Sequence, residues 1–134
     1  MTAARSSQST VSLKNALTAG ALGGFVADVI NTLVYVVAQS FIGGPLIVEG
    51  EPLPLVAILL SSFTPGLAAG AVYWGLARYT GTPMRWFLIL AASLLVLSFF
   101  GPLTQASGAT LWALELMHLG AAAPIVGALS RLRS

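Results

Sequence analysis

The chain has 134 residues, of which 57% are hydrophobic and only 7% are charged, and its formal net charge is +2. Soluble domains carry about 25% charged residues, so this composition excludes a water-soluble globule and indicates a membrane protein. The absence of cysteine excludes a disulfide framework and thiol chemistry. The first apolar run is longer than the roughly 7 to 15 residues of a cleavable signal peptide core, which argues against such a peptide.

Four apolar runs follow one another along the chain, each with about the 20 residues that a helix needs to cross a bilayer. Residues 1–14 are rich in Ser, Thr and Ala and predict a mobile polar tail. Residues 15–134 then predict one transmembrane domain. Its spans lie at about 15–41, 55–79, 86–103 and 109–129. Strand alternation is absent, so we expect an all-α bundle of four transmembrane helices with short loops.

The charged residues supply an independent test of this count. With four spans, every basic residue falls on one side of the membrane: Arg5, Lys14, Arg78, Arg85, Arg131 and Arg133. The acidic residues Glu49 and Glu51 fall in the first connection, on the other side. Because cytoplasmic loops are enriched in Lys and Arg, we expect a multi-pass protein of the cytoplasmic (inner) membrane with both termini in the cytoplasm.

Small residues four apart let membrane helices approach closely, and three of the spans contain them. The predicted packing residues are Gly20 and Gly24 in the first span, Ser62, Gly66 and Gly70 in the second, and Gly120, Ala123 and Gly127 in the fourth. The third span lacks such a row, so we expect it to be the most lipid-exposed. Pro65 and Pro124 lie inside helices and predict kinks there.

Four polar residues interrupt the apolar spans and form the candidate ligand- or proton-binding site: Asp28, Asn31, Glu115 and His118. Within each pair the spacing of three residues predicts one helix face. At 1.5 Å per residue, the four fall in one layer at or just outside the membrane midplane. Such residues usually face the bundle interior and pair. Two arrangements fit: Asp28 and His118 share a proton, or burial keeps one or both carboxylic acids neutral. If the polar layer lines a cavity, we expect that cavity to open outward.

Three functions fit this polar layer. The leading hypothesis is a small membrane binding or transport module, proton- or cation-linked, with the site between the first and fourth helices. The first alternative is a structural or accessory subunit of a membrane complex, in which the cluster joins helices. The second is a haem- or pigment-binding protein that uses His118 as axial ligand.

Other chemistry has little support in the sequence. No nucleophile elbow, phosphate loop or dinucleotide fingerprint is present, so no catalytic residue is assigned and an enzyme is not indicated. Glu115 and His118 are candidate metal ligands, but their spacing alone identifies neither a metal nor a cofactor. The bilayer is the expected partner, together with a second copy or a membrane-complex subunit. The basic residues lie at helix ends rather than in a nucleic-acid patch.

The segments Asp28–Tyr35 and Glu115–Leu129, combined with four spans in a chain of this length, resemble an uncharacterised family of small bacterial four-helix membrane proteins. The resemblance covers the chain from Lys14 onward. It implies the same four-span fold and brings no known activity.

Overall fold

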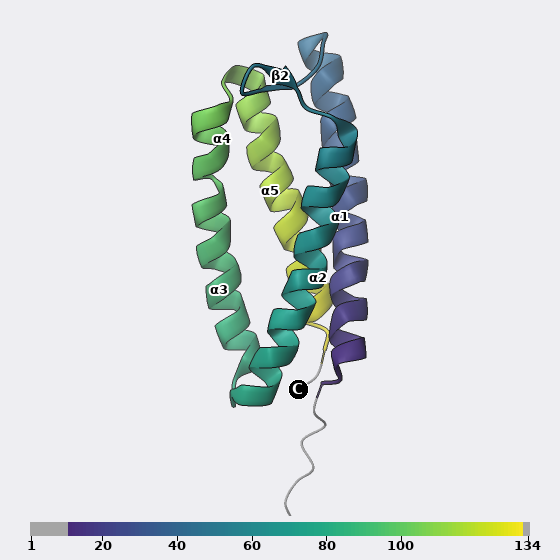
Figure 1. Ribbon diagram of the computed structural model, residues 1–134, viewed down its shortest axis with the longest axis vertical. Coiled ribbons are helices and arrows are strands. Elements are labelled where there is room, and N and C mark those ends of the chain that lie inside the picture. Colours follow the sequence, from purple (N-terminus) through teal and green to yellow (C-terminus); the bar gives the residue numbers. More distant parts are fainter. Residues whose placement is uncertain (1–10, 133–134) are drawn as a thin grey trace, which may run out of the picture.

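The computed structural model describes residues 11–132, and these form long antiparallel helices (Figure 1). The helices are α1 (Leu13–Ile42), α2 (Leu55–Tyr79), α3 (Pro83–Ser98), α4 (Phe100–Gln105) and α5 (Gly108–Leu129), and a hairpin of β1 (Ile47–Val48) and β2 (Glu51–Pro52) joins α1 to α2. α3 and α4 together make one span, so four helical segments are long and apolar enough to cross a membrane. The predicted all-α, four-span membrane class is confirmed.

The first helix begins two residues earlier than the predicted span. The Ser12 hydroxyl oxygen accepts a hydrogen bond of 3.1 Å from the Asn15 backbone N–H and caps the helix. Leu13 and Lys14 therefore belong to α1, while residues 1–10 of the predicted tail lie outside the described residues. The helix ends at Gly43, whose φ of 74° is a left-handed conformation that glycine adopts without steric cost.

The third span is interrupted at Phe99, where its sequence predicts a continuous helix. Pro102 has no N–H to give to the Ser98 carbonyl four residues before it. At the same point the Phe99 N–H bonds the Val96 carbonyl, three residues back, at 3.3 Å, which is a tighter turn than an α-helix makes. The missing bond separates α3 from α4 and places the Phe99 ring at the junction.

The first connection folds as a hairpin, where only a loop was expected. Its two turn residues, Glu49 and Gly50, have φ of 53° and 85°, as the type I′ turn of a two-residue hairpin requires. Leu46, just before β1, is fully buried. The Glu49 N–H donates to the Gln105 carbonyl at 2.9 Å. These contacts fasten the hairpin across the end of the bundle, between α1 and α4.

Helix α1 lies against both α2 and α5 and contacts them through its backbone. A Cβ atom added to Gly66 would lie 2.5 Å from the Gly20 carbonyl oxygen and 2.8 Å from the Gly24 Cα. On a second face of α1, a Cβ on Gly23 would lie 2.7 Å from the Ile125 Cα. Glycine alone permits approaches this close, so α1, α2 and α5 form a tight unit.

The remaining predicted packing residues divide into two groups. Gly70 lies against the Ala16 carbonyl, Ser62 is buried, and Gly120 lies against Asn31. Ala123 is exposed, and a Cβ on Gly127 would meet no atom within 4 Å. These two positions do not show the close backbone approach that Gly23 and Gly66 show. In the second half of α5, the buried residues are Ile125 and Leu129 rather than Ala123 and Gly127.

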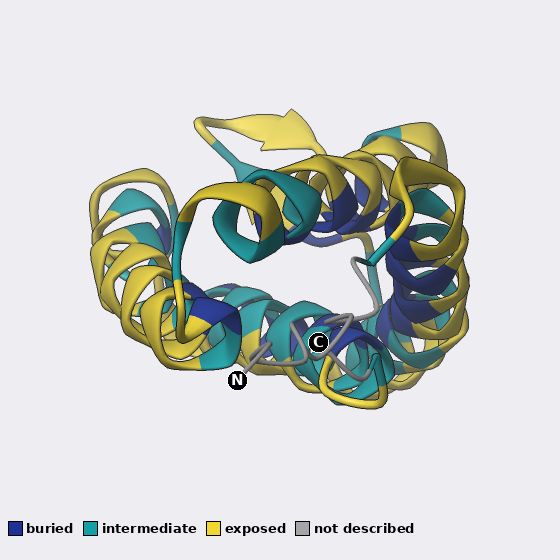
Figure 2. Cartoon of the chain, turned by 90° about the horizontal axis from the view of Figure 1, so that it is seen from below, coloured by how far each residue is buried: buried dark blue, intermediate teal, exposed yellow. Residues whose placement is uncertain are grey.

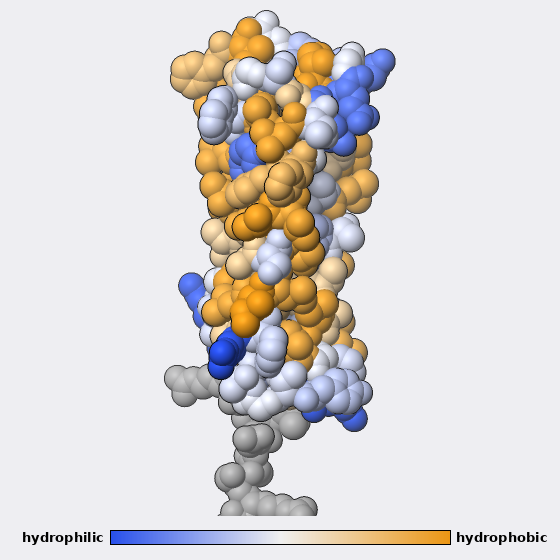
Figure 3. Space-filling model, turned by 90° about the vertical axis from the view of Figure 1, so that its left-hand side faces the viewer, coloured by the Kyte–Doolittle hydropathy of each residue, from blue (hydrophilic) through white to orange (hydrophobic). Residues whose placement is uncertain are grey.

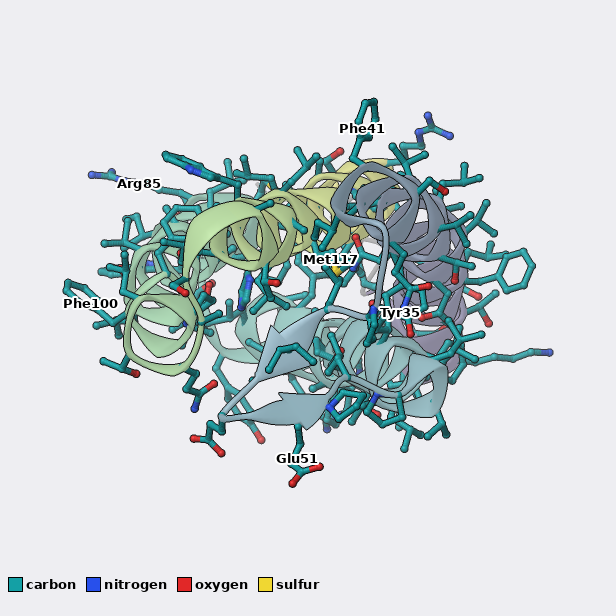
Figure 4. The ribbon with its side chains drawn as sticks, turned by 90° about the horizontal axis from the view of Figure 1, so that it is seen from above. Tyr35, Phe41, Glu51, Arg85, Phe100 and Met117 are labelled. Atoms are coloured by element: carbon teal, nitrogen blue, oxygen red, sulfur yellow. The ribbon has the colours of Figure 1, made fainter. Side chains whose placement is uncertain are left out.

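The span formed by α3 and α4 is the least buried of the four, as expected from its composition. Its face presents a broad apolar surface with hydrophilic residues toward the two ends (Figure 3). Buried residues gather on the sides of the helices that face one another (Figure 2). From above, Phe41 and Phe100 project away from the bundle, whereas Met117 lies inside it (Figure 4). This pattern is the one that lipid contact requires.

Charge and chain ends are segregated along the bundle axis. Val11 and Leu132 pack against the same hydrophobic core cluster, so the two described chain ends lie at one end of the bundle. That end also carries the basic residues Lys14, Arg78, Arg85 and Arg131 at its helix termini. The acidic hairpin lies at the opposite end (Figure 1). The fold thus reproduces the charge separation that the four-span count implied.

Candidate functional site

A cavity of about 420 Å³ lies between α2, α3 and α5. Alanines such as Ala68, Ala91 and Ala122 line it, and their short side chains leave the space open. Below it, the Tyr73 and Phe87 rings meet edge to face at 5.5 Å and join α2 to α3. The polar residues that line this cavity are Ser61, Ser98 and His118. Its walls are otherwise apolar.

A smaller chamber of about 240 Å³ adjoins this cavity on the side of the hairpin. Asn31 of α1, Leu53 beside the hairpin and Met117 of α5 contribute to its wall. Ser61, His118 and Ala121 line both chambers. The larger chamber continues to Phe87 near the start of α3, so the hollow is not confined to the half of the bundle nearer the hairpin.

His118 stands where the two chambers meet. Its Nδ1 atom lies 2.7 Å from the Leu114 carbonyl oxygen, one turn earlier in α5. A carbonyl oxygen only accepts hydrogen bonds, so Nδ1 carries the hydrogen, and in the neutral ring Nε2 is left as an acceptor. The Phe99 ring lies edge-on to the imidazole at 6.2 Å between ring centres. The histidine is therefore held from its own helix and from the α3–α4 junction.

Asn31 connects three helices at the smaller chamber. It is only 3% exposed, and its Nδ2 donates a hydrogen bond of 2.9 Å to the Ser62 hydroxyl of α2. Ser62 in turn donates to the Ile58 carbonyl. The Asn31 Oδ1 has no partner and lies beside Gly120, where a Cβ would stand 2.5 Å from it. Gly120 thus makes room on α5 for the amide of α1.

The interhelical hydrogen bond gives a first prediction. In a double-mutant cycle of Asn31→Ala and Ser62→Ala, we expect a coupling of about 0.6 kcal/mol, and at most about 1.7, because membrane hydrogen bonds compete with other polar partners. The measurement is the free energy of unfolding in mixed detergent micelles. Ser61→Ala is the matched control, since its hydroxyl also bonds the Ile58 carbonyl but not Asn31. Equal coupling in both cycles would contradict the assigned bond.

The two carboxylates lie away from the cavity. Gly20 and Gly24 face α2, so Asp28, one turn further on, lies on the α1–α2 flank. Leu119 and Ala122 line an outer groove between α3 and α5, and Glu115 is one turn before Leu119 on the same side. Asp28 Oδ1 and Glu115 Oε1 are buried without a hydrogen-bond partner.

The predicted four-residue cluster therefore separates into parts. Asn31 and His118 line one chamber, but Asp28 is not joined to His118, and the expected shared proton is not seen within residues 11–132. The spacing placed all four at similar depth, while the rotation of each helix turned the acids away from the two chambers. Across the same residues, no three His, Cys, Asp or Glu side chains come together to hold a metal.

Three residues of the site were missed as site residues: Ser61, Ser98 and Phe99. Serine is common in membrane helices, so a serine carries little signal by itself. The one available clue was that Ser61 and Ser98 lie at a depth in the membrane similar to that of His118. Phe99 reaches the site only because the third span is broken there.

Comparison with known proteins identifies the chain by family alone. Residues 11–134 match the Family of unknown function (DUF6069), and the chain belongs to this family. The resemblance to an uncharacterised family is thereby confirmed. No curated protein and no solved structure matches the chain.

Proposed function

We propose that the protein, whose family has no known activity, is a binding module of the cytoplasmic membrane. It holds a small, largely apolar molecule between α2, α3 and α5. The observation that carries the proposal is the cavity of about 420 Å³. Ligand pockets are typically about 300 to 1,000 Å³, mostly apolar, with a few polar groups that orient the ligand. Ser61, Ser98 and His118 are the polar groups here.

The orientation in the membrane forms part of the proposal. The end that carries Lys14, Arg78, Arg85 and Arg131 faces the cytoplasm, because short cytoplasmic segments are enriched in basic residues. Both termini are then cytoplasmic, and the hairpin with Glu49 and Glu51 faces outward. The smaller chamber lies toward the outer side and the larger one continues inward.

The ligand is better described as uncharged than as a cation. Among the described residues, His118 is the one titratable side chain that lines either chamber, and both carboxylates lie elsewhere. A cation pathway through the bundle would require acidic side chains or a ring of carbonyl groups facing it. The Ser61 hydroxyl donates to the Ile58 carbonyl rather than to His118, so the pair is not arranged as nucleophile and base.

Naphthalene is a suitable probe for the cavity. We expect it to bind the protein in nanodiscs above its partition into empty nanodiscs, as measured by calorimetry. Ala121→Leu should weaken this binding at least about 10-fold, because the larger side chain fills space shared by both chambers. Ala71→Leu is the control, since Ala71 is exposed on α2 and lines neither chamber. Binding no greater than in empty nanodiscs would overturn the proposal, as would equal effects of the two substitutions.

A further inference from the structure

We infer that the polar end of the ligand is an uncharged hydrogen-bond donor, such as the hydroxyl of an alcohol or phenol. This inference rests on the proposed function and specifies the chemical class of the ligand. It follows from the hydrogen bonds between the side chains that line the cavity and backbone carbonyl groups of the protein. Almost every polar hydrogen on that wall is used within the protein, and acceptor atoms remain.

The imidazole of His118 is the central acceptor. Its Nδ1 hydrogen is directed at the Leu114 carbonyl oxygen, 2.7 Å away. In the neutral ring, Nε2 therefore presents a lone pair and no hydrogen. The contact between the Phe99 ring and the imidazole limits rotation of the ring. Only a ligand with a hydrogen to donate can use Nε2.

The two serines present the same chemistry. Ser61 donates its hydroxyl hydrogen to the Ile58 carbonyl at 3.0 Å, and Ser98 donates to the Leu95 carbonyl at 2.7 Å. Each hydroxyl has one hydrogen and two lone pairs, so each retains only acceptor capacity toward the cavity.

Asn31 offers no open acceptor to the smaller chamber, because its Oδ1 is packed against Gly120. Its Nδ2 gives one hydrogen to Ser62, and its Oδ1 is buried without a partner. The second Nδ2 hydrogen is the one uncommitted side-chain donor on the wall. Between residues 11 and 132, no Lys, Arg, Tyr or Trp lines either chamber.

This imbalance selects among otherwise similar molecules. A donor can bond Nε2 or a serine oxygen, and each such hydrogen bond improves binding. A ketone, ether or carboxylate would place its lone pairs against those of Nε2 and the serine oxygens. These acceptor atoms would then remain without a hydrogen-bond partner. Sites that hydrogen-bond one polar group reject analogues that lack it more strongly than apolar pockets reject an altered shape. The wall therefore discriminates by hydrogen-bond direction.

A matched set of probes tests the inference: naphthalene, 2-naphthol and 2-methoxynaphthalene, of which only 2-naphthol donates. In nanodiscs, 2-naphthol should bind about 5- to 10-fold more tightly than 2-methoxynaphthalene after subtraction of partition into empty nanodiscs. His118→Phe should keep naphthalene binding and abolish most of this preference. Ser93→Ala, on the exposed side of α3, should leave it unchanged.

The possible outcomes separate the two proposals. If none of the three probes binds above partition, the proposed function fails. If naphthalene binds but 2-methoxynaphthalene equals or exceeds 2-naphthol, the cavity is real and the donor inference is overturned. A spectrum of the 15N-labelled ring needs no variant, because His118 is the only histidine in the chain. Hydrogen on Nδ1 supports the inference, and hydrogen on Nε2 overturns it.

Discussion

Gly66→Ala should lower the free energy of unfolding by about 2 to 3 kcal/mol, the upper part of the range for overpacking. The added Cβ would lie 2.5 Å from the Gly20 carbonyl oxygen, 2.8 Å from the Gly24 Cα and 3.0 Å from the Gly24 backbone nitrogen. All three atoms are backbone, so no side chain can rotate away and the whole of α1 must move. Unfolding in mixed detergent micelles gives the measurement.

Gly75→Ala is the control on the same helix. A Cβ at Gly75 would meet nothing within 4 Å, so its effect should stay within about 0.5 kcal/mol. If the two alanine variants unfold at the same detergent composition, the close approach of α1 and α2 is wrong.

Gly23→Ala should cost about 2 kcal/mol through the other interface of α1. Here the Cβ would lie 2.7 Å from the Ile125 Cα and 3.0 Å from the Pro124 carbonyl oxygen. Relief requires α5 to move away from α1, and α5 carries His118. The same unfolding assay applies, and Gly127→Ala on α5, in open space, should have almost no effect. A large loss from Gly127→Ala together with none from Gly23→Ala would contradict the arrangement of α1 and α5.

The spans could be predicted because hydrophobic length is a strong and local signal. The second span was predicted at 55–79, which is the range of α2. Pro54 before it and the Gly81–Pro83 region after it limit the helix. The sequence did not reveal the hairpin, because its turn begins with Glu49, a residue that does not signal a left-handed conformation. The break at Phe99 depends on one missing hydrogen bond, and a hydropathy pattern does not register it.

The candidate site was predictable in depth but not in rotation. Counting residues along each span gives the height of a side chain in the membrane. It does not give the direction of that side chain relative to the other helices, which depends on which faces pack. The row through Gly20 and Gly24 turns toward α2 and takes Asp28 with it, while Asn31 is brought to the chamber of His118.

The glycine contacts of α1 also determine how this chain can tolerate change. In an ordinary core, a larger side chain at one position can be offset by a smaller one opposite, since volume can be exchanged between neighbours. Opposite Gly66, however, the neighbouring atoms belong to the main chain of α1. Backbone atoms cannot be made smaller by substitution, so no second substitution in α1 can restore the fit. The outer surface, where residues such as Leu22 and Phe25 are exposed, accepts any apolar side chain that lipid accepts.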